Sequence, residues 1–285
     1  MPLYSVCSHI IESPQMPKRF QPFLIDEQQD IGKTDLSFQY SSEPIKAHQP
    51  IQVASLPDMI VWKDSILDGS YQWIYQLRNG SASISVNPDY SEATIHYPSH
   101  MGYVFNGKMG EIFGPYIQII LECKLISNGF AVLHAACVEK DGIAFAFTGH
   151  SGVGKSTRAA KWCEVLSAEL ISGDRPAIDV EKERVYGVPW DGKEGVYRNV
   201  CYPLAAILKV SRSDTAAVEN LTENEKTQIL SEQISVPMWD TALAAKSISS
   251  LRNLVKHVPV FDLHCGIDDF STVMAYDLVT RKISE

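Results

Sequence analysis

Residues 149–156, Gly-His-Ser-Gly-Val-Gly-Lys-Ser, constrain the fold of this chain more than any other stretch. The segment matches the pattern G-x-x-x-x-G-K-[ST] in full, which is typical of a loop that wraps phosphate groups between a strand and a helix. Its three glycines permit backbone conformations that turn successive N–H groups toward an anion. An apolar, strand-like run, "IAFAFT", precedes the loop, and an amphipathic helix is expected over residues 155–166. The sequence therefore predicts a nucleotide-binding loop.

The residue types in the loop predict a role for each position. Lys155 is expected to reach the β- and γ-phosphates, and the Ser156 hydroxyl is expected to ligate Mg²⁺. The helix that starts at the end of the loop points its positive end at the same place. ATP and Mg²⁺ are therefore the expected cofactors. The residues expected to bind the nucleotide are Gly149, His150, Ser151, Gly152, Val153, Gly154, Lys155, Ser156 and Thr157.

The composition indicates which binding partners and which cellular compartment to expect. The formal net charge is −9 and the pI is about 5.4, which argues against nucleic acid or an anionic membrane as the main partner. The sequence shows neither a basic-plus-apolar N-terminal signal nor an apolar run of transmembrane length. None of the 6 cysteines forms a C-x-x-C pair, and buried, reduced thiols are expected at Cys123, Cys137, Cys163 and Cys201. These features favour the cytoplasm.

The pattern of apolar residues changes near residue 110. Before it, short alternating runs such as "LYSVCSHI" and "LSFQYS" predict strands, as does "SEATIHYP". The runs "YQWIYQL" and "SASISVN", separated by "RNG", predict a β-hairpin. Residues 111–129 are apolar at helical spacing and end at Asn-Gly, so a bridging helix is expected there. We predict a β-rich N-terminal domain over residues 1–110, available for partner or acceptor recognition, and a nucleotide-binding catalytic domain over residues 111–285.

Helices and strands alternate in the second domain, which predicts an α/β (α+β) fold. "FAVLHAACVEKDGIAFAFTG" is expected to form two strands joined at Asp141-Gly142, and "AELISGDRPAIDVEKERVYGVP" two strands around a polar turn. Two further strands are expected, "LAAILKV" and "VPVFDLHC". Three amphipathic helices are expected, "LTENEKTQILSEQI", "TALAAKSISSLRNLVKH" and "DDFSTVMAYDLVTRKI".

Three features around the loop carry a family resemblance. His134 in "LHAACVEKDG" precedes the loop, Asp174 in "LISGDRPAI" follows its helix, and "PWDGK" follows at residues 189–193. This order resembles the C-terminal catalytic domain of HPr kinase/phosphorylase, whose P-loop fold is shared with phosphoenolpyruvate carboxykinase. The resemblance covers roughly residues 128–275 and not the N-terminal region. "PWDGK" is similar to a branch of HPr-kinase-like proteins that includes lasso-peptide precursor serine kinases.

The resemblance implies a catalytic set of Asp174, His134 and Lys155, with Ser156 and Asp174 on the metal. His134 matches the family's histidine near the transferred phosphate, and Asp174 matches the second carboxylate of an Asp-Asp pair. Gly173 stands where the family has the first carboxylate. Either Asp174 then both activates the acceptor and organises Mg²⁺, or a further group helps. Asp191 and His134 are the candidates for that help. Candidate electrostatic clamps on the γ-phosphate or the acceptor are Arg175, Lys193 and Arg198.

The resemblance implies an ATP- and Mg²⁺-dependent kinase that transfers the γ-phosphate to a hydroxyl, most plausibly a serine of a peptide or small protein. Two alternatives stay open. One is a small-molecule kinase with the same core, and the other is a nucleotide-binding regulatory module without transferase activity, which Gly173 favours. A carboxykinase is disfavoured because the chain is short for that enzyme. The resemblance is compatible with either a monomer or a homo-oligomer.

Overall fold

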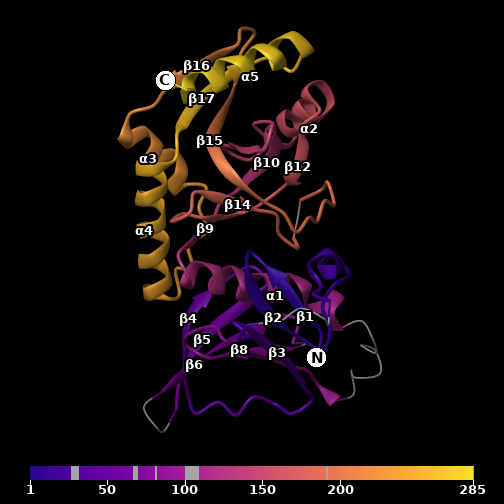
Figure 1. Ribbon diagram of the computed structural model, residues 1–285. Helices are drawn as coiled ribbons and strands as arrows, with labels where there is room; N and C mark the ends of the chain where they lie inside the picture. Colours follow the sequence, from indigo (N-terminus) through magenta and orange to yellow (C-terminus); the bar gives the residue numbers. More distant parts are fainter. Residues whose placement is uncertain (27–31, 67–69, 81, 100–108, 191, 285) are drawn as a thin grey trace. The chain divides into compact units, whose positions relative to one another are not determined.

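The computed structural model describes residues 1–26, 32–66, 70–80, 82–99, 109–190 and 192–284 (Figure 1). The chain has a mixed α/β fold that divides into two compact units. Unit 1 comprises Met1–Asn128 and Pro237–Ala244, and unit 2 comprises Gly129–Val236 and Ala245–Glu285. The helix expected over residues 111–129 is present as α1 (Met109–Ser127), and it belongs to unit 1 rather than to unit 2. The first unit thus extends past the boundary expected at residue 110.

Unit 1 is built on a mixed sheet with the order β1-β2-β3-β8-β7-β6-β5-β4. Strands β2, β3 and β8 run parallel, and the remaining neighbours are antiparallel. The expected hairpin is confirmed as β6 paired with β7, and the other strands expected in this region are present. The bounds are β1 Leu3–Val6, β2 His9–Glu12, a 3-10 helix Lys18–Phe23, β3 Leu36–Ser41, β4 Gln49–Ser55, β5 Met59–Ser65, β6 Tyr71–Leu77, β7 Ser83–Val86 and β8 Glu92–His96.

Unit 2 contains a second mixed sheet with the order β12-β10-β11-β15-β14-β13-β9, and β17 extends it from β15. The strands are β9 Phe130–Val132, β10 Ala135–Lys140, β11 Ile143–Thr148, β12 Glu169–Ser172, β13 Ala177–Asp179, β14 Arg184–Tyr186, β15 Cys201–Arg212, β16 Ala217–Asn220 and β17 Val260–Cys265. The helices are α2 Lys155–Leu166, α3 Glu223–Ser231, α4 Thr241–His257, of which the part from Ala245 on belongs to this unit, and α5 Asp269–Ser284. The expected positions of all these helices are confirmed.

The strand directions bring several chain segments to one edge of this sheet. Strands β11, β15 and β17 run parallel, so their carboxyl ends lie at the same edge. Strand β10 is antiparallel to both β11 and β12, so β12 ends at that edge as well. The start of β10 lies there too, because Ala135 pairs with Thr148, the last residue of β11. The loop after β11 therefore meets the turn after β12 and the residue before β10.

The core of unit 2 lies on both faces of the sheet. On one face, Trp162 of α2 is fully buried against Phe145 and Phe147 of β11, with ring centroids 5.2 and 5.0 Å apart. Tyr276 of α5 completes this aromatic group at 5.4 Å from Trp162. On the opposite face, apolar side chains of α4 such as Leu254 pack against the strands. Figure 1 shows α2 with β10 and β12 in the upper part of the picture. Burial of these large side chains fixes the helix that follows the loop.

Three expectations about local structure are wrong. The run containing His134 forms the two strands β9 and β10, with His134 at a bend between them rather than within a strand. The bend occurs because β9 pairs with β13, whereas β10 pairs with β11 and β12. The segment after α2 likewise forms three strands instead of two. All the cysteines are free, but Cys163 and Cys201 are only partly buried. Cys163 packs against the edge of a core cluster without entering it.

Within the residues described, no helix combines the length and the apolar character that crossing a membrane requires.

Candidate active site

The glycine-rich loop (residues 149–156) follows the end of β11 and runs into the first turn of α2. Gly149 has φ +136°, and a Cβ there would lie 3.2 Å from Val153 Cγ1. Gly154 is the N-cap of α2 with φ +112°, and no side chain caps the helix. The first turn of α2 contains no acidic residue. Its N–H groups and the positive end of the helix dipole are therefore available to an anion held by the loop.

Lys155 is the first residue of α2, and its ammonium group folds back over the loop. Its Nζ atom donates to Gly149 O at 2.9 Å and to His150 O at 3.4 Å. The residue is only 9% exposed. Burial lowers the pKa of Lys155 from its ordinary value, while the nearby Asp174 carboxylate acts in the opposite direction. A buried cation thus lies at the mouth of the loop, with backbone carbonyls as its partners.

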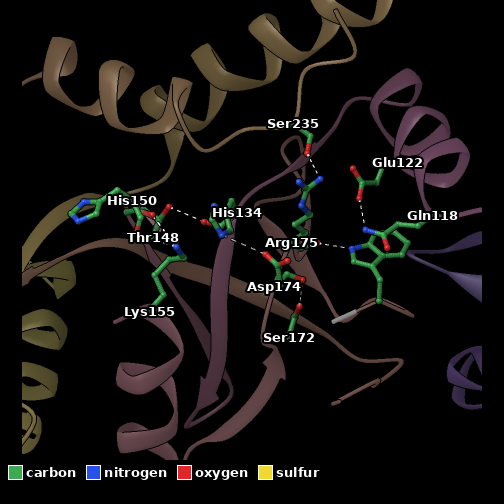
Figure 2. Close-up of polar contacts among 12 residues, drawn as sticks. Gln118, Glu122, His134, Thr148, His150, Lys155, Ser172, Asp174, Arg175 and Ser235 are labelled. Carbon is green, nitrogen blue, oxygen red and sulfur yellow. Dashed lines mark hydrogen bonds and ion pairs between the residues drawn. The ribbon is translucent and has the colours of Figure 1, made fainter. Parts of the chain in front are cut away.

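His134 and Asp174 lie beside Lys155, as Figure 2 shows. His134 Nε2 is 3.8 Å from Asp174 Oδ1, and the two side chains are 41% and 35% exposed. The backbone of His134 is fixed on both sides, since its N–H donates to Gln233 O at 2.8 Å and its carbonyl accepts from Thr148 Oγ1 at 3.1 Å. Asp174 Oδ1 is buried and accepts no hydrogen bond from the residues that the structure describes. A carboxylate oxygen without a donor is costly to bury and is suited to a metal ion or a proton donor.

The turn that carries Asp174 has an unusual backbone. Arg175 has φ +52°, a left-handed conformation that is strained for a residue with a side chain. The carbonyl of Asp174 accepts from Ser172 Oγ at 2.8 Å, and the carbonyl of Arg175 accepts from Trp190 Nε1 at 3.0 Å. Trp190 is 2% exposed. These two hydrogen bonds hold the turn in the conformation that directs Asp174 toward the loop.

One cleft with a volume of ≈ 410 Å³ brings most of the expected residues together. The loop and helix contribute Ser151, Gly152, Gly154, Lys155, Ser156 and Thr157, and the neighbouring segments contribute His134, Gly173, Asp174, Gly192, Lys193 and Glu194. The other expected loop residues, Gly149, His150 and Val153, lie outside this lining. His150 is exposed and borders a different cleft on the far side of the loop.

The three expected electrostatic clamps differ in position. Lys193 lines the cleft. The Arg175 guanidinium instead donates to Ser235 Oγ at 3.5 Å. Arg198 pairs with Glu169 Oε2 at 2.6 Å and donates to Leu170 O, so β12 holds it. Asp191 lies outside the residues that the structure describes.

Sequence reasoning missed two supporting residues, one at the loop and one at the turn that carries Asp174. Arg212 Nη2 donates to Gly152 O at 3.0 Å, and its Nε donates to Val153 O at 3.4 Å. Arg212 ends β15, which is parallel to β11, so the rule that parallel strands end at one edge would have pointed to it. Trp190 supports the turn that carries Asp174, and no signal in the sequence pairs it with Arg175.

The ionisation of His134 gives a testable expectation. Partial burial and the positive charge of Lys155 lower its pKa from the usual value, Asp174 acts in the opposite direction, and Arg175 lowers it further. The lowered pKa favours the neutral form of the imidazole. A polyphosphate bound in the cleft brings negative charge and should raise this pKa. NMR titration of the imidazole resonance, assigned with His134→Gln, should show a pKa below 6.5 alone and a higher pKa with Mg²⁺ and nucleotide. If the pKa of His134 does not change when Mg²⁺ and nucleotide are added, the phosphates bind away from this cleft.

Trp190→Phe tests the role of the Trp190 hydrogen bond. The variant keeps an aromatic ring but loses the donor to Arg175 O, so unfolding free energy should fall by about 1 kcal/mol. For a kinase of the kind that the sequence predicts, turnover should fall by about tenfold, because Asp174 is no longer held in place. Trp239→Phe is the matched control, since it removes the bond from Trp239 Nε1 to Tyr75 Oη at 3.1 Å in unit 1. Denaturant unfolding and initial rates separate the two effects, and equal turnover in both variants would contradict a positioning role.

Searches against protein-family models and against curated proteins give no match to this chain.

Proposed function

We propose that this protein is an ATP- and Mg²⁺-dependent kinase of the HPr-kinase-like P-loop type, transferring the γ-phosphate to a hydroxyl group. One observation carries the proposal. A single cleft contains the glycine-rich loop with Lys155, the Asp174 carboxylate, whose buried Oδ1 atom accepts no hydrogen bond from the described residues, and the imidazole of His134. Phosphoryl transfer requires a bound nucleotide, neutralised phosphate charge and an oriented acceptor oxygen. The cleft offers residues for each of these requirements.

The loop and Lys155 would bind the phosphates. The backbone N–H groups of the loop and the first turn of α2 would cradle the α- and β-phosphates. Lys155 would exchange its bonds with Gly149 O and His150 O for bonds to the β- and γ-phosphate oxygens. Burial of Lys155 strengthens this charge interaction relative to an exposed lysine.

Ser156 and Asp174 fit a magnesium ion. Both line the cleft, and both offer the oxygen ligands that Mg²⁺ prefers. The buried Oδ1 atom of Asp174, which accepts no hydrogen bond from the described residues, is the structural feature that such an ion would satisfy. Among the described residues there is no cluster of three or more histidine, cysteine, aspartate or glutamate side chains suited to a metal. Protein sites for Mg²⁺ are ordinarily completed by substrate phosphates and water. When bound, the ion would neutralise charge that develops on the β- and γ-phosphates.

Asp174 and His134 would act on the acceptor. The acceptor hydroxyl oxygen attacks the γ-phosphorus, the bond to the β,γ-bridging oxygen breaks, and the hydroxyl proton passes to an Asp174 carboxylate oxygen. A neutral His134 would hold the carboxylate through Nε2 or share the proton with it. With Gly173 in the position of the family's first carboxylate, Asp174 supplies the only carboxylate of this turn. It therefore carries both roles in this proposal.

The proposed acceptor is a serine of a peptide or small protein, as the family resemblance implies. A small-molecule hydroxyl is the alternative within the same chemistry. A nucleotide-binding module without transfer is the alternative that Gly173 favours. Incubation with γ-labelled ATP, Mg²⁺ and panels of seryl peptides and small hydroxyl compounds tests all three. Label on a peptide supports the proposal, and label on a metabolite supports a small-molecule kinase. The kinase assignment would be overturned if the protein bound nucleotide tightly but transferred no label at stoichiometric enzyme. In that case the label transferred by wild type would equal that transferred by the Lys155→Ala variant.

A further inference from the structure

A short segment after α3 runs beside the bend that carries His134. The N–H of His134 donates to Gln233 O at 2.8 Å, and the N–H of Ser235 donates to Val132 O at 2.8 Å. An isolated antiparallel bridge lies between these two hydrogen bonds. The backbone of Gln233 is therefore fixed next to the backbone of His134, although the two residues are distant in sequence.

The side chain of Gln233 is buried and ends in an unsatisfied oxygen. Gln233 is 8% exposed, and its Oε1 atom accepts no hydrogen bond of ordinary length and angle from the described residues. A buried amide oxygen without a donor is costly. Burial is the main influence on the pKa of His134 and lowers it, whereas the Gln233 side chain raises it. A neighbour that raises the pKa of an imidazole acts as an acceptor, so Oε1 is the amide atom that faces the ring.

The imidazole of His134 therefore lies between two acceptor oxygens. On one side, Nε2 is 3.8 Å from Asp174 Oδ1, which is longer than a hydrogen bond. On the other side, Nδ1 is the ring nitrogen that remains for Gln233 Oε1. A neutral imidazole carries one N–H and donates to only one of the two oxygens. Asp174 Oδ1 lies beyond hydrogen-bonding reach and suits a metal ion, so Gln233 is the oxygen left to accept the N–H.

We infer that Gln233 is a positioning residue, which accepts a hydrogen bond from His134 Nδ1–H and leaves the lone pair of Nε2 facing Asp174. The partner of one imidazole nitrogen commonly decides which of the two carries the proton. The consequence for catalysis rests on the function proposed above. There the acceptor hydroxyl loses its proton to an Asp174 oxygen, and the Nε2 lone pair takes that proton on, which returns Asp174 to its charged form. The resulting imidazolium would donate to Asp174 through Nε2 and to Gln233 through Nδ1.

The tautomer of His134 is measurable in the full chain. Long-range ¹H–¹⁵N correlation spectra of protein labelled at histidine report which ring nitrogen carries the proton, at a pH where the ring is neutral. The His134→Gln variant identifies the resonances. We expect the wild-type ring to be mainly in the Nδ1–H form. Gln233→Met removes the acceptor and should shift the ring mainly to the Nε2–H form, whereas Gln233→Glu keeps an acceptor oxygen and should retain the Nδ1–H form.

Gln228→Met is the matched control, because Gln228 lies in α3 shortly before Gln233 and is exposed. This variant should keep the wild-type tautomer and the wild-type turnover. In Gln233→Met, turnover should fall by about tenfold, because His134 is no longer held in the productive form. The KM for nucleotide should stay close to that of wild type, since other residues line the cleft that contains the loop. Initial rates of phosphate transfer measure both quantities.

The outcomes separate this inference from the proposed function. A wild-type ring mainly in the Nε2–H form, or the same tautomer in wild type and Gln233→Met, would overturn the inference. The kinase proposal would then still stand, because the spectra are recorded without nucleotide. A folded wild type that transfers no phosphate would overturn the kinase proposal and leave the tautomer assignment standing. If circular dichroism shows that Gln233→Met is unfolded, wild type and Gln233→Glu decide, and the Nε2–H form in either would overturn the inference.

Discussion

Asp174→Asn should reduce kcat by roughly 10²- to 10⁴-fold, the range expected for loss of a general base. Asparagine has nearly the same shape but cannot accept the acceptor's proton, and it is a weaker ligand for Mg²⁺. The turn should survive, since Ser172 and Trp190 hold it through the backbone carbonyls of Asp174 and Arg175. Binding of metal-free nucleotide should therefore remain close to that of wild type. Single-turnover transfer of labelled phosphate and equilibrium binding measure the two properties separately.

Asp141→Asn is the matched control for this substitution. Asp141 lies in the turn between β10 and β11, at the opposite end of those strands from the loop, and pairs with Lys140 at 2.8 Å. Its φ of +55° is one that asparagine adopts readily. Turnover should be unchanged in this variant. A comparable loss in both variants would indicate a general effect on the fold, and full activity of Asp174→Asn would remove Asp174 from the mechanism.

Lys155→Met should weaken nucleotide binding by about 10- to 100-fold, as expected for loss of a charged hydrogen bond to phosphate. Turnover should fall by a further 10²- to 10³-fold or so, because the ammonium would also stabilise charge on the transferred phosphate. Methionine retains much of the apolar stem, which is buried against the loop. Calorimetry and single-turnover kinetics separate binding from transfer.

Lys161→Met provides the comparison on the same helix. Lys161 pairs with Glu164 at 3.1 Å and with Asp269 at 2.7 Å, and it does not line the active-site cleft. Both nucleotide binding and turnover should match wild type in this variant. If Lys155→Met bound nucleotide normally, the loop would not be the phosphate site. If it bound weakly but turned over normally at saturation, Lys155 would contribute to binding alone.

The secondary structure was predictable wherever a segment carried a strong periodic pattern with a local stop signal. Helix α1 ends before Asn-Gly, and the hairpin of β6 and β7 surrounds a glycine turn. Strand β4 carried no such pattern, since nearly every residue in it is exposed. Its pairing with β5 defines it, and pairing is not encoded in the periodicity of one segment. The division of β9 from β10 at His134 was missed for the same reason, because different partners define the two strands.

The sequence by itself determined the glycine-rich loop, its preceding strand and its following helix. Those features depend on local backbone conformations and on apolar spacing, which a few adjacent residues encode. Only the tertiary structure decided that His134, Lys155 and Asp174 line one cleft, and that Trp190 and Arg212 support it. Their positions follow from hydrogen bonds among β10, β11, β12 and β15, whose partners are distant in sequence. Strand order and direction are properties of the whole sheet, so no single segment carries them.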